Sequence, residues 1–313
     1  MNKKYLTNFA YFGGKSRLTY KLREYIEEGA SACNIFIDGF GGSGAVTLNI
    51  NRDIFERSII NDLNPKLFLI HKMLSNSNTA YQVKDLIEDT ELSREYFERA
   101  KKVWEPYEAT IREEFELKML AETNAALFDS HKDMWKKYIP EEKSIELAAA
   151  ALIMFKQSFN GLGKSSRPEY YGNEDYQYYK WIDNTLDKVI EQMEGVEAYC
   201  VNTLVLVNKY KNHSNVFMYL DSPYELKTRK NRKAYEIDMD DEDQKRYMDT
   251  IIDSRAPIII SGYKYNGKSI YDRLVASGKW RCEILAEDIP KSSANLGVGN
   301  EKPRVDEWIW LNY

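Results

Sequence analysis

Apolar residues follow two different rhythms along the chain. Near both ends, short apolar or β-branched runs close on glycine, asparagine or aspartate, as is typical of strands that end in turns. Over residues 1–75 these runs alternate with stretches in which apolar positions recur every three or four residues, as in helices. The predicted order is a helix near Arg17–Glu28, a strand Ile35–Asp38, a helix near Val46–Asn51, a strand Ser58–Asn61 and a helix opened by Asn64 and Pro65.

The middle of the chain, residues 76–200, has helical periodicity and no strand pattern until its end. Charged residues lie on one face of its helices and Leu, Ile, Phe and Trp on the other. The predicted helices include Arg94–Trp104, Ile111–Thr123, Ile145–Phe159 and Tyr178–Met193. We interpret this segment as a helical insertion.

The alternation returns from Asn215 onward. It predicts strands Val216–Leu220, Pro257–Ser261, Arg281–Leu285 and Val305–Asn312, with helices Asp241–Ser254 and Ser269–Ala276 between them. Residues 1–75 and 201–313 should therefore form one α/β domain, an open parallel sheet with helices on both faces, which the insertion 76–200 interrupts.

Composition limits the classes of partner. The 313 residues hold 44 Lys and Arg against 49 Asp and Glu, so a net charge of -5 gives no overall attraction to nucleic acid or to an anionic membrane. Any contact with DNA must rest on a local patch. Three scattered cysteines and three unpaired histidines argue against a disulfide framework and against a metal site. The longest apolar run, Leu147 to Phe155, is too short to cross a bilayer, and the basic start lacks the apolar stretch of a signal peptide, so we expect a cytoplasmic protein.

A glycine turn follows the first predicted strand. Gly39, Gly41 and Gly44 fit a GxGxxG spacing, in which missing side chains let the main chain approach a ligand. Asp62, at the end of the next strand, is placed to accept hydrogen bonds from a ribose diol. Together these features favour an adenosine-bearing cofactor, although a structural turn beside a surface aspartate is the alternative.

A second glycine pair lies upstream, in Tyr11-Phe12-Gly13-Gly14-Lys15-Ser16. A phosphate-binding loop would need glycine at position 9, where the chain has Phe9, so that interpretation is weak. The aromatic ring could instead cover one side of a cofactor, with Lys15 placed as a cation near a carboxylate.

The most specific pattern is Asp221-Ser222-Pro223-Tyr224, directly after the strand Val216–Leu220. Pro223 has a fixed φ and biases Ser222 towards an extended conformation, so the turn is stiff. Asp221 and the Ser222 carbonyl would then present two acceptors, which suits an exocyclic amine with two N–H donors. Tyr224 offers a face on which a base can stack. An ordinary capped turn is the alternative.

With these motifs in this order, the chain resembles the Dam-type (D12 class, alpha group) DNA adenine N6-methyltransferases over nearly its whole length. The resemblance rests on Tyr11–Lys15, Asp38–Gly44, Asn61–Asn64 and Asp221–Tyr224. Ser222 stands where the family usually has its first proline, and Tyr11 stands where tryptophan is common. The loop after Gly161 also lacks the pattern of members that recognise GATC.

The resemblance implies a class I methyltransferase fold, with a seven-stranded Rossmann-like sheet whose last strand is antiparallel and with a target-recognition insertion. It implies S-adenosylmethionine as cofactor. The residues expected to contact it are Tyr11, Gly14, Lys15, Asp38, Gly39, Phe40, Gly41, Gly42, Ser43, Gly44, Asp62 and Asp221. The expected catalytic residues are Asp221, Ser222, Pro223 and Tyr224.

Double-stranded DNA is the expected partner, and a cognate restriction endonuclease is a further candidate. A basic run directly after the catalytic turn could neutralise phosphates, although such a run is often only a solvated loop. The candidates are Lys227, Arg229, Lys230, Arg232 and Lys233 in this run, and Lys156, Asn160, Lys164 and Arg167 in the insertion.

The sequence thus predicts a site-specific DNA methyltransferase that transfers a methyl group from S-adenosylmethionine to the N6 amine of an adenine flipped out of duplex DNA. No metal is needed for this transfer. The alternatives are a nicotinamide-dependent oxidoreductase, which would also use the glycine turn, and an inactive module that binds DNA or cofactor.

Overall fold

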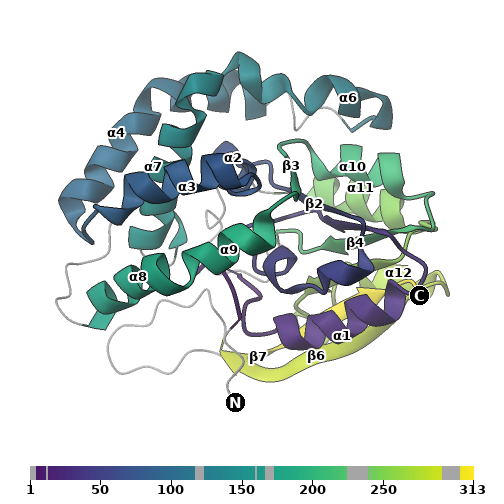
Figure 1. The fold of residues 1–313 in the computed structure, drawn as a ribbon. Helices are drawn as coiled ribbons and strands as arrows, with labels where there is room; N and C mark the ends of the chain where they lie inside the picture. The colour runs from purple at the N-terminus through teal and green to yellow at the C-terminus, as the bar shows by residue number, and fades with distance from the viewer. Residues whose placement is uncertain are drawn as a thin grey trace.

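A twisted seven-stranded sheet forms the centre of the computed structural model (Figure 1). The structure describes residues 5–11, 13–116, 123–158, 161–165, 173–223, 239, 241–290 and 304–313. The strands are β1 (Ile35–Asp38), β2 (Arg57–Asn61), β3 (Glu197–Tyr199), β4 (Val216–Leu220), β5 (Ile258–Gly262), β6 (Arg281–Pro290) and β7 (Arg304–Leu311), in the order β3-β2-β1-β4-β5-β7-β6. The first five are parallel, whereas β7 runs antiparallel to both β5 and β6. The expected seven-stranded sheet with an antiparallel last strand is therefore confirmed.

Helices cover both faces of this sheet, which explains why the central strands are apolar throughout. All five residues of β4 are buried, and successive residues point to opposite faces. Met218 packs in one cluster with side chains from α10 (Thr203–Tyr210), α11 (Asp241–Ile251) and α12 (Asp272–Ala276). Phe217 packs on the other face, in a cluster to which α1 (Thr19–Gly29) contributes.

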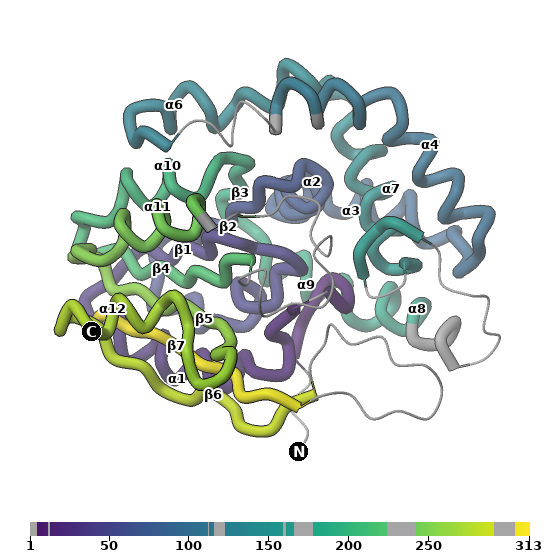
Figure 2. The backbone as a smooth tube through the Cα atoms, turned by 180° about the vertical axis from the view of Figure 1, so that it is seen from behind, coloured from purple at the N-terminus to yellow at the C-terminus, as the bar shows by residue number. Residues whose placement is uncertain are grey.

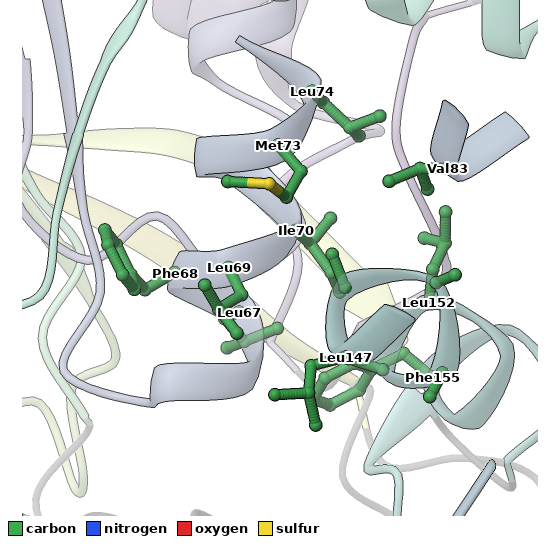
Figure 3. Close-up of a cluster of buried hydrophobic side chains, with 14 of the residues drawn as sticks. Leu67, Phe68, Leu69, Ile70, Met73, Leu74, Val83, Leu147, Leu152 and Phe155 are labelled. Atoms are coloured by element: carbon green, nitrogen blue, oxygen red, sulfur yellow. The ribbon is translucent and has the colours of Figure 1, made fainter. Parts of the chain in front are cut away.

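A helical layer packs on the β3 side of the sheet, away from the β6–β7 pair (Figures 1 and 2). Its helices are α2 (Pro65–Leu74), α3 (Ser77–Glu88), α4 (Arg94–Thr110), α7 (Ser144–Gln157), α8 (Asn173–Asn184) and α9 (Leu186–Met193). The short α6 (Phe128–His131) packs against α10 instead. The central helix α7 is buried on all sides from Leu147 to Phe155. Figure 3 shows Leu147, Leu152 and Phe155 of α7 facing side chains of α2 and α3. The apolar run in the sequence is therefore an interior helix. Within the described part of the chain, none of the helices has both the length and the apolar character needed to cross a bilayer.

Several predicted boundaries were wrong. The helix near Val46–Asn51 is replaced by two 3₁₀ turns, Thr47–Asn49 and Arg52–Ile54. The Asn49 side chain binds the main chain of Leu6, donating to its carbonyl at 2.8 Å and accepting from its amide at 3.0 Å, and the next residue is extended. Such side-chain bonds to the main chain compete with helix continuation.

The predicted helix Tyr178–Met193 is two helices, α8 and α9, which separate at Thr185. The helix expected over Ile111–Thr123 begins as a π-helical segment, Ile111–Glu116, after which residues 117–122 lie outside the described residues. Helix α10 was not predicted. Strand β3 belongs to the sheet although it falls within the segment 76–200, and the proposed division into domain and insertion stays a prediction.

Candidate active site

A cleft opens at the carboxyl ends of the parallel strands β1, β2 and β4. In the sheet, β2 and β3 lie on one side of β1, whereas β4 and β5 lie on the other. A crevice forms where the direction of winding changes in this way, and open α/β sheets bind ligands there.

The glycine turn after β1 forms part of the wall of this cleft. The Gly41 N–H donates to the Asn61 carbonyl at 2.8 Å, which ties the turn to the end of β2. Gly42 has a φ of +51°, and a Cβ at this position would lie 3.1 Å from the Tyr11 ring. Glycine is therefore required for the backbone conformation, and it also leaves room for the aromatic ring beside the turn.

The buried side chain of His71 is hydrogen bonded to the same turn. Its Nε2 lies 3.0 Å from the Gly42 carbonyl oxygen, and because a carbonyl can only accept, Nε2 carries the proton. Burial lowers the pKa of His71 to about 4, although the bond to Gly42 opposes this change. A neutral imidazole thus holds the turn at neutral pH.

Asp38, at the end of β1, brings a buried carboxyl group to the cleft. Its Oδ2 accepts a 2.9 Å hydrogen bond from Thr47 Oγ1, whereas no described residue satisfies Oδ1. Burial raises the pKa of Asp38 to about 7; the Thr47 bond opposes this rise, and the neighbouring Asp221 adds to it. The group is thus suited to receive a cationic ligand, which would restore its charge.

Asp62 follows β2 and is oriented by the main chain. Its Oδ2 accepts from the Gly42 N–H at 2.8 Å, and its Oδ1 accepts from the Asn64 N–H at 2.9 Å. A carboxylate oxygen can accept more than one hydrogen bond. Asp62 therefore lines the cleft with a carboxylate that the main chain holds in place.

The Asp221 carboxylate forms an ion pair with Lys15. Lys15 Nζ lies 2.9 Å and 2.7 Å from the two Asp221 oxygens, and 3.4 Å from Glu307 Oε1. Lys15 and Glu307 are buried, but the Asp221 side chain keeps 17% of its surface exposed and lines the cleft. Burial lowers the pKa of Lys15, but the two carboxylates outweigh this effect and raise it, so the lysine is a cation.

A chain of hydroxyl groups fixes the other side of Asp221. Ser261 Oγ donates to Asp221 Oδ1 at 2.7 Å, and the Tyr219 hydroxyl lies 2.9 Å from the same Ser261 oxygen. Because the Ser261 proton is used by Asp221, Tyr219 must be the donor to Ser261. Asp221 is therefore held by a cation and a hydroxyl while one edge faces the cleft.

The two residues after Asp221 differ in their exposure to the cleft. Pro223 lines it. The Ser222 side chain is buried away from it, and its hydroxyl lies 2.5 Å from the Tyr271 hydroxyl. Tyr224, expected to stack on the base, lies outside the described residues.

The structure thus brings most of the expected cofactor and catalytic residues to one cleft. Those that line it are Tyr11, Gly14, Lys15, Asp38, Phe40, Gly41, Gly42, Ser43, Asp62, Asp221 and Pro223. Gly39 and Gly44 belong to the same turn but not to the lining, with Gly39 bonded to the Tyr219 carbonyl and Gly44 packed against His71. Their individual roles stay predictions.

The residues expected to bind DNA are mostly beyond the described parts of the chain. Asn160, Arg167, Lys227, Arg229, Lys230, Arg232 and Lys233 all lie there. Of the other two, Lys156 places its Nζ 3.6 Å from the centre of the Trp181 ring. Lys164 lines a second hollow, between α2, α4 and α7.

Sequence reasoning missed several residues of the site. Glu307 and Ser261 contact the Lys15–Asp221 pair from β7 and β5. Asn202 and Thr203 line the cleft at the start of α10. The Asn202 side chain caps α10 by accepting from the Leu204 N–H, and Asn before the apolar run Leu-Val-Leu-Val was the signal that could have predicted this helix.

Comparison with known proteins gives two similarities. The model of the family described as D12 class N6 adenine-specific DNA methyltransferase matches residues 11–284. The chain is also similar to the type II methyltransferase M.MjaIII of Methanocaldococcus jannaschii, with 25% identity over 243 residues that cover 75% of each chain. The matched family range contains the glycine turn and the corner after β4, residues Asp221–Tyr224, and it ends before β7.

Proposed function

Because the chain belongs to the family of D12 class N6 adenine-specific DNA methyltransferases and methylates adenine in DNA, we propose that it takes the methyl group from S-adenosylmethionine bound in the cleft. The observation that carries this proposal is the Asp38 carboxyl group, which is buried at the switch point of the sheet and has one oxygen that no described residue satisfies. A buried acceptor of this kind needs a donor, and the α-ammonium group of S-adenosylmethionine is one.

The other residues of the cleft fit the remaining parts of that cofactor. Asp62, oriented by two main-chain donors, would accept from the ribose hydroxyls. Tyr11 and Phe40 line the cleft with aromatic surface that suits a purine. When bound, S-adenosylmethionine supplies an electrophilic methyl group on a sulfonium.

Asp221 and the Ser222 carbonyl are proposed to hold the adenine amine. Two acceptors would take its two N–H donors and direct the nitrogen lone pair towards the methyl group. Lys15 and Ser261 fix the Asp221 carboxylate before the base arrives, so its orientation costs little at the moment of reaction. We therefore assign most of the rate gain to alignment and to preorganised acceptors.

The adenine must leave the base stack to reach this corner. We propose that Tyr224 stacks on the extruded base, which is worth about 1–3 kcal/mol and offsets part of an unstacking cost of a few kcal/mol. The basic run from Lys227 to Lys233 and the helices of segment 76–200 would hold the DNA backbone and recognise the target.

The test is methyl transfer from radiolabelled S-adenosylmethionine to duplex DNA without adenine methylation. The wild-type chain should label N6 of adenine, and Asp221→Ala should abolish the transfer while cofactor affinity falls less. A thermal-shift comparison should show stabilisation by S-adenosylmethionine and none by NAD. Substantial methylation by Asp221→Ala would remove this residue from its role.

A further inference from the structure

A buried hydrogen-bond chain lies behind the catalytic corner, outside the lining of the cleft. The Ser222 and Tyr271 hydroxyls lie 2.5 Å apart, and the Tyr271 hydroxyl lies 3.3 Å from Gln244 Oε1. Gln244 Nε2 donates to the Pro223 carbonyl at 2.7 Å. The side chains of Ser222, Gln244 and Tyr271 are all buried. These hydrogen bonds therefore connect two consecutive residues of the corner, 222 and 223, to α11 and to the start of α12.

The direction of every bond follows from one carbonyl group. The Pro223 oxygen can only accept, so the Gln244 amide must present its NH₂ group there and its Oε1 to Tyr271. Tyr271 then donates to Gln244, and its oxygen must accept from Ser222.

We propose that Tyr271 and Gln244 are positioning residues, which fix the Ser222–Pro223 peptide so that the Ser222 carbonyl is aimed at the substrate amine. This inference rests on the proposed function of the corner. A proline at position 222 would restrict φ covalently, whereas serine leaves that angle free. The buried Ser222 hydroxyl replaces the covalent restraint by a hydrogen bond to Tyr271.

Three observations support a role in positioning. Neither Tyr271 nor Gln244 lines the cleft, so neither is placed to hold cofactor or base. Gln244 is bonded to the main chain of Pro223, which sets the direction of the peptide after the corner. Tyr271 itself packs against Trp310 of β7, with ring centres 5.1 Å apart, so the restraint is anchored in the sheet.

The decisive experiment measures kcat and the KM for S-adenosylmethionine of four full-length proteins on DNA without adenine methylation: the wild type, Tyr271→Phe, Ser222→Pro and the double variant. We expect Tyr271→Phe to lower kcat about tenfold, equivalent to about 1.4 kcal/mol in the barrier, with KM within about twofold. Ser222→Pro supplies the reference kcat for the double variant, because its proline restricts φ covalently. In the Ser222→Pro background, Tyr271→Phe should then change kcat less than about twofold, because proline supplies the restraint.

Tyr178→Phe is the matched control, since it removes another buried hydroxyl pair, Thr90 with Tyr178 at 2.6 Å, in the helical layer. It should lower the melting temperature about as much as Tyr271→Phe and leave kcat unchanged. A Tyr271→Phe enzyme with wild-type kcat would overturn the proposal, and so would a loss of kcat that is equal with and without the Ser222→Pro substitution.

If Ser222→Pro does not fold, the double-mutant cycle of Ser222→Ala and Tyr271→Phe decides. If each single substitution lowers kcat equally and the double variant loses no more, the two residues share one role; additive losses of kcat reject that role. Absence of methyl transfer by the wild type would instead reject the proposed function itself, so the two failures are distinguishable.

Discussion

The affinity for the cofactor should depend on pH through Asp38. The pKa of this carboxyl is raised from 3.8 to about 7 by burial, so the group is mostly protonated at pH 6 in the empty protein. It must ionise to pair with an ammonium group. If a pKa of 7 applies, about one molecule in ten is ionised at pH 6 and about nine in ten at pH 8. Binding should therefore be about tenfold weaker at pH 6 than at pH 8.

Isothermal titration calorimetry with S-adenosylhomocysteine tests this dependence, because this ligand keeps the ammonium group and lacks the sulfonium charge. Asp38→Asn should bind more weakly at pH 8 and should lose the dependence on pH between 6 and 8. A wild-type affinity that does not change over this range, or a dependence that persists in Asp38→Asn, would refute the assignment of the ammonium group to Asp38.

The same pKa carries a consequence for stability. A raised folded-state pKa means that the folded protein binds the proton more tightly, so this stabilisation is full below pH 3.8 and is lost as the pH rises to about 7. The step from 3.8 to about 7 corresponds to about 4 kcal/mol. Asp38→Asn should thus stabilise the empty protein at pH 8 more than at pH 5 in urea denaturation, and an equal effect at both pH values would contradict the raised pKa.

Three further predictions concern the Lys15 ion pair, the glycine turn and the basic run. Lys15→Met leaves the Asp221 and Glu307 carboxylates close together without their cation. It should lower the free energy of unfolding in denaturant by about 3–5 kcal/mol. Glu307→Gln keeps the lysine paired with Asp221 and should lower it less. Gly42→Ala strains a residue at φ +51° and should lower both the melting temperature and the cofactor affinity. Reversing the charges of Arg229 and Arg232 should weaken DNA binding. The slope of log K against log salt concentration should fall by the equivalent of about two phosphate contacts, and an unchanged slope would reject that assignment.

The sequence predicted the parts of this molecule that local chemistry determines. Strand Ile35–Asp38 was located to the residue because an apolar run ends there on an acidic group and glycine. The cleft residues Asp38, Asp62 and Asp221 each lie at the end of a strand or directly after it, so parallel strands bring them to one edge. Part of what sequence reasoning missed depends on tertiary contact: the Asn49 side chain, where a predicted helix ends, binds the main chain of Leu6, which is distant in sequence.

The position of Glu307 depends on strand order, and this explains why no local pattern could indicate it. Strand β7 is antiparallel to β5, with Trp308 opposite Gly262, so its first residues lie at the carboxyl end of β5, where the cleft opens. Because alternate residues share a face, Glu307 lies on the side of Ile309 and Leu311, whose cluster includes α1. Lys15 lies four residues before Thr19, the first residue of α1, and meets Glu307 on this side of the sheet. A slip of one residue in β7 would turn Glu307 to the opposite face, so the register of the last strand also determines the charge beside Asp221.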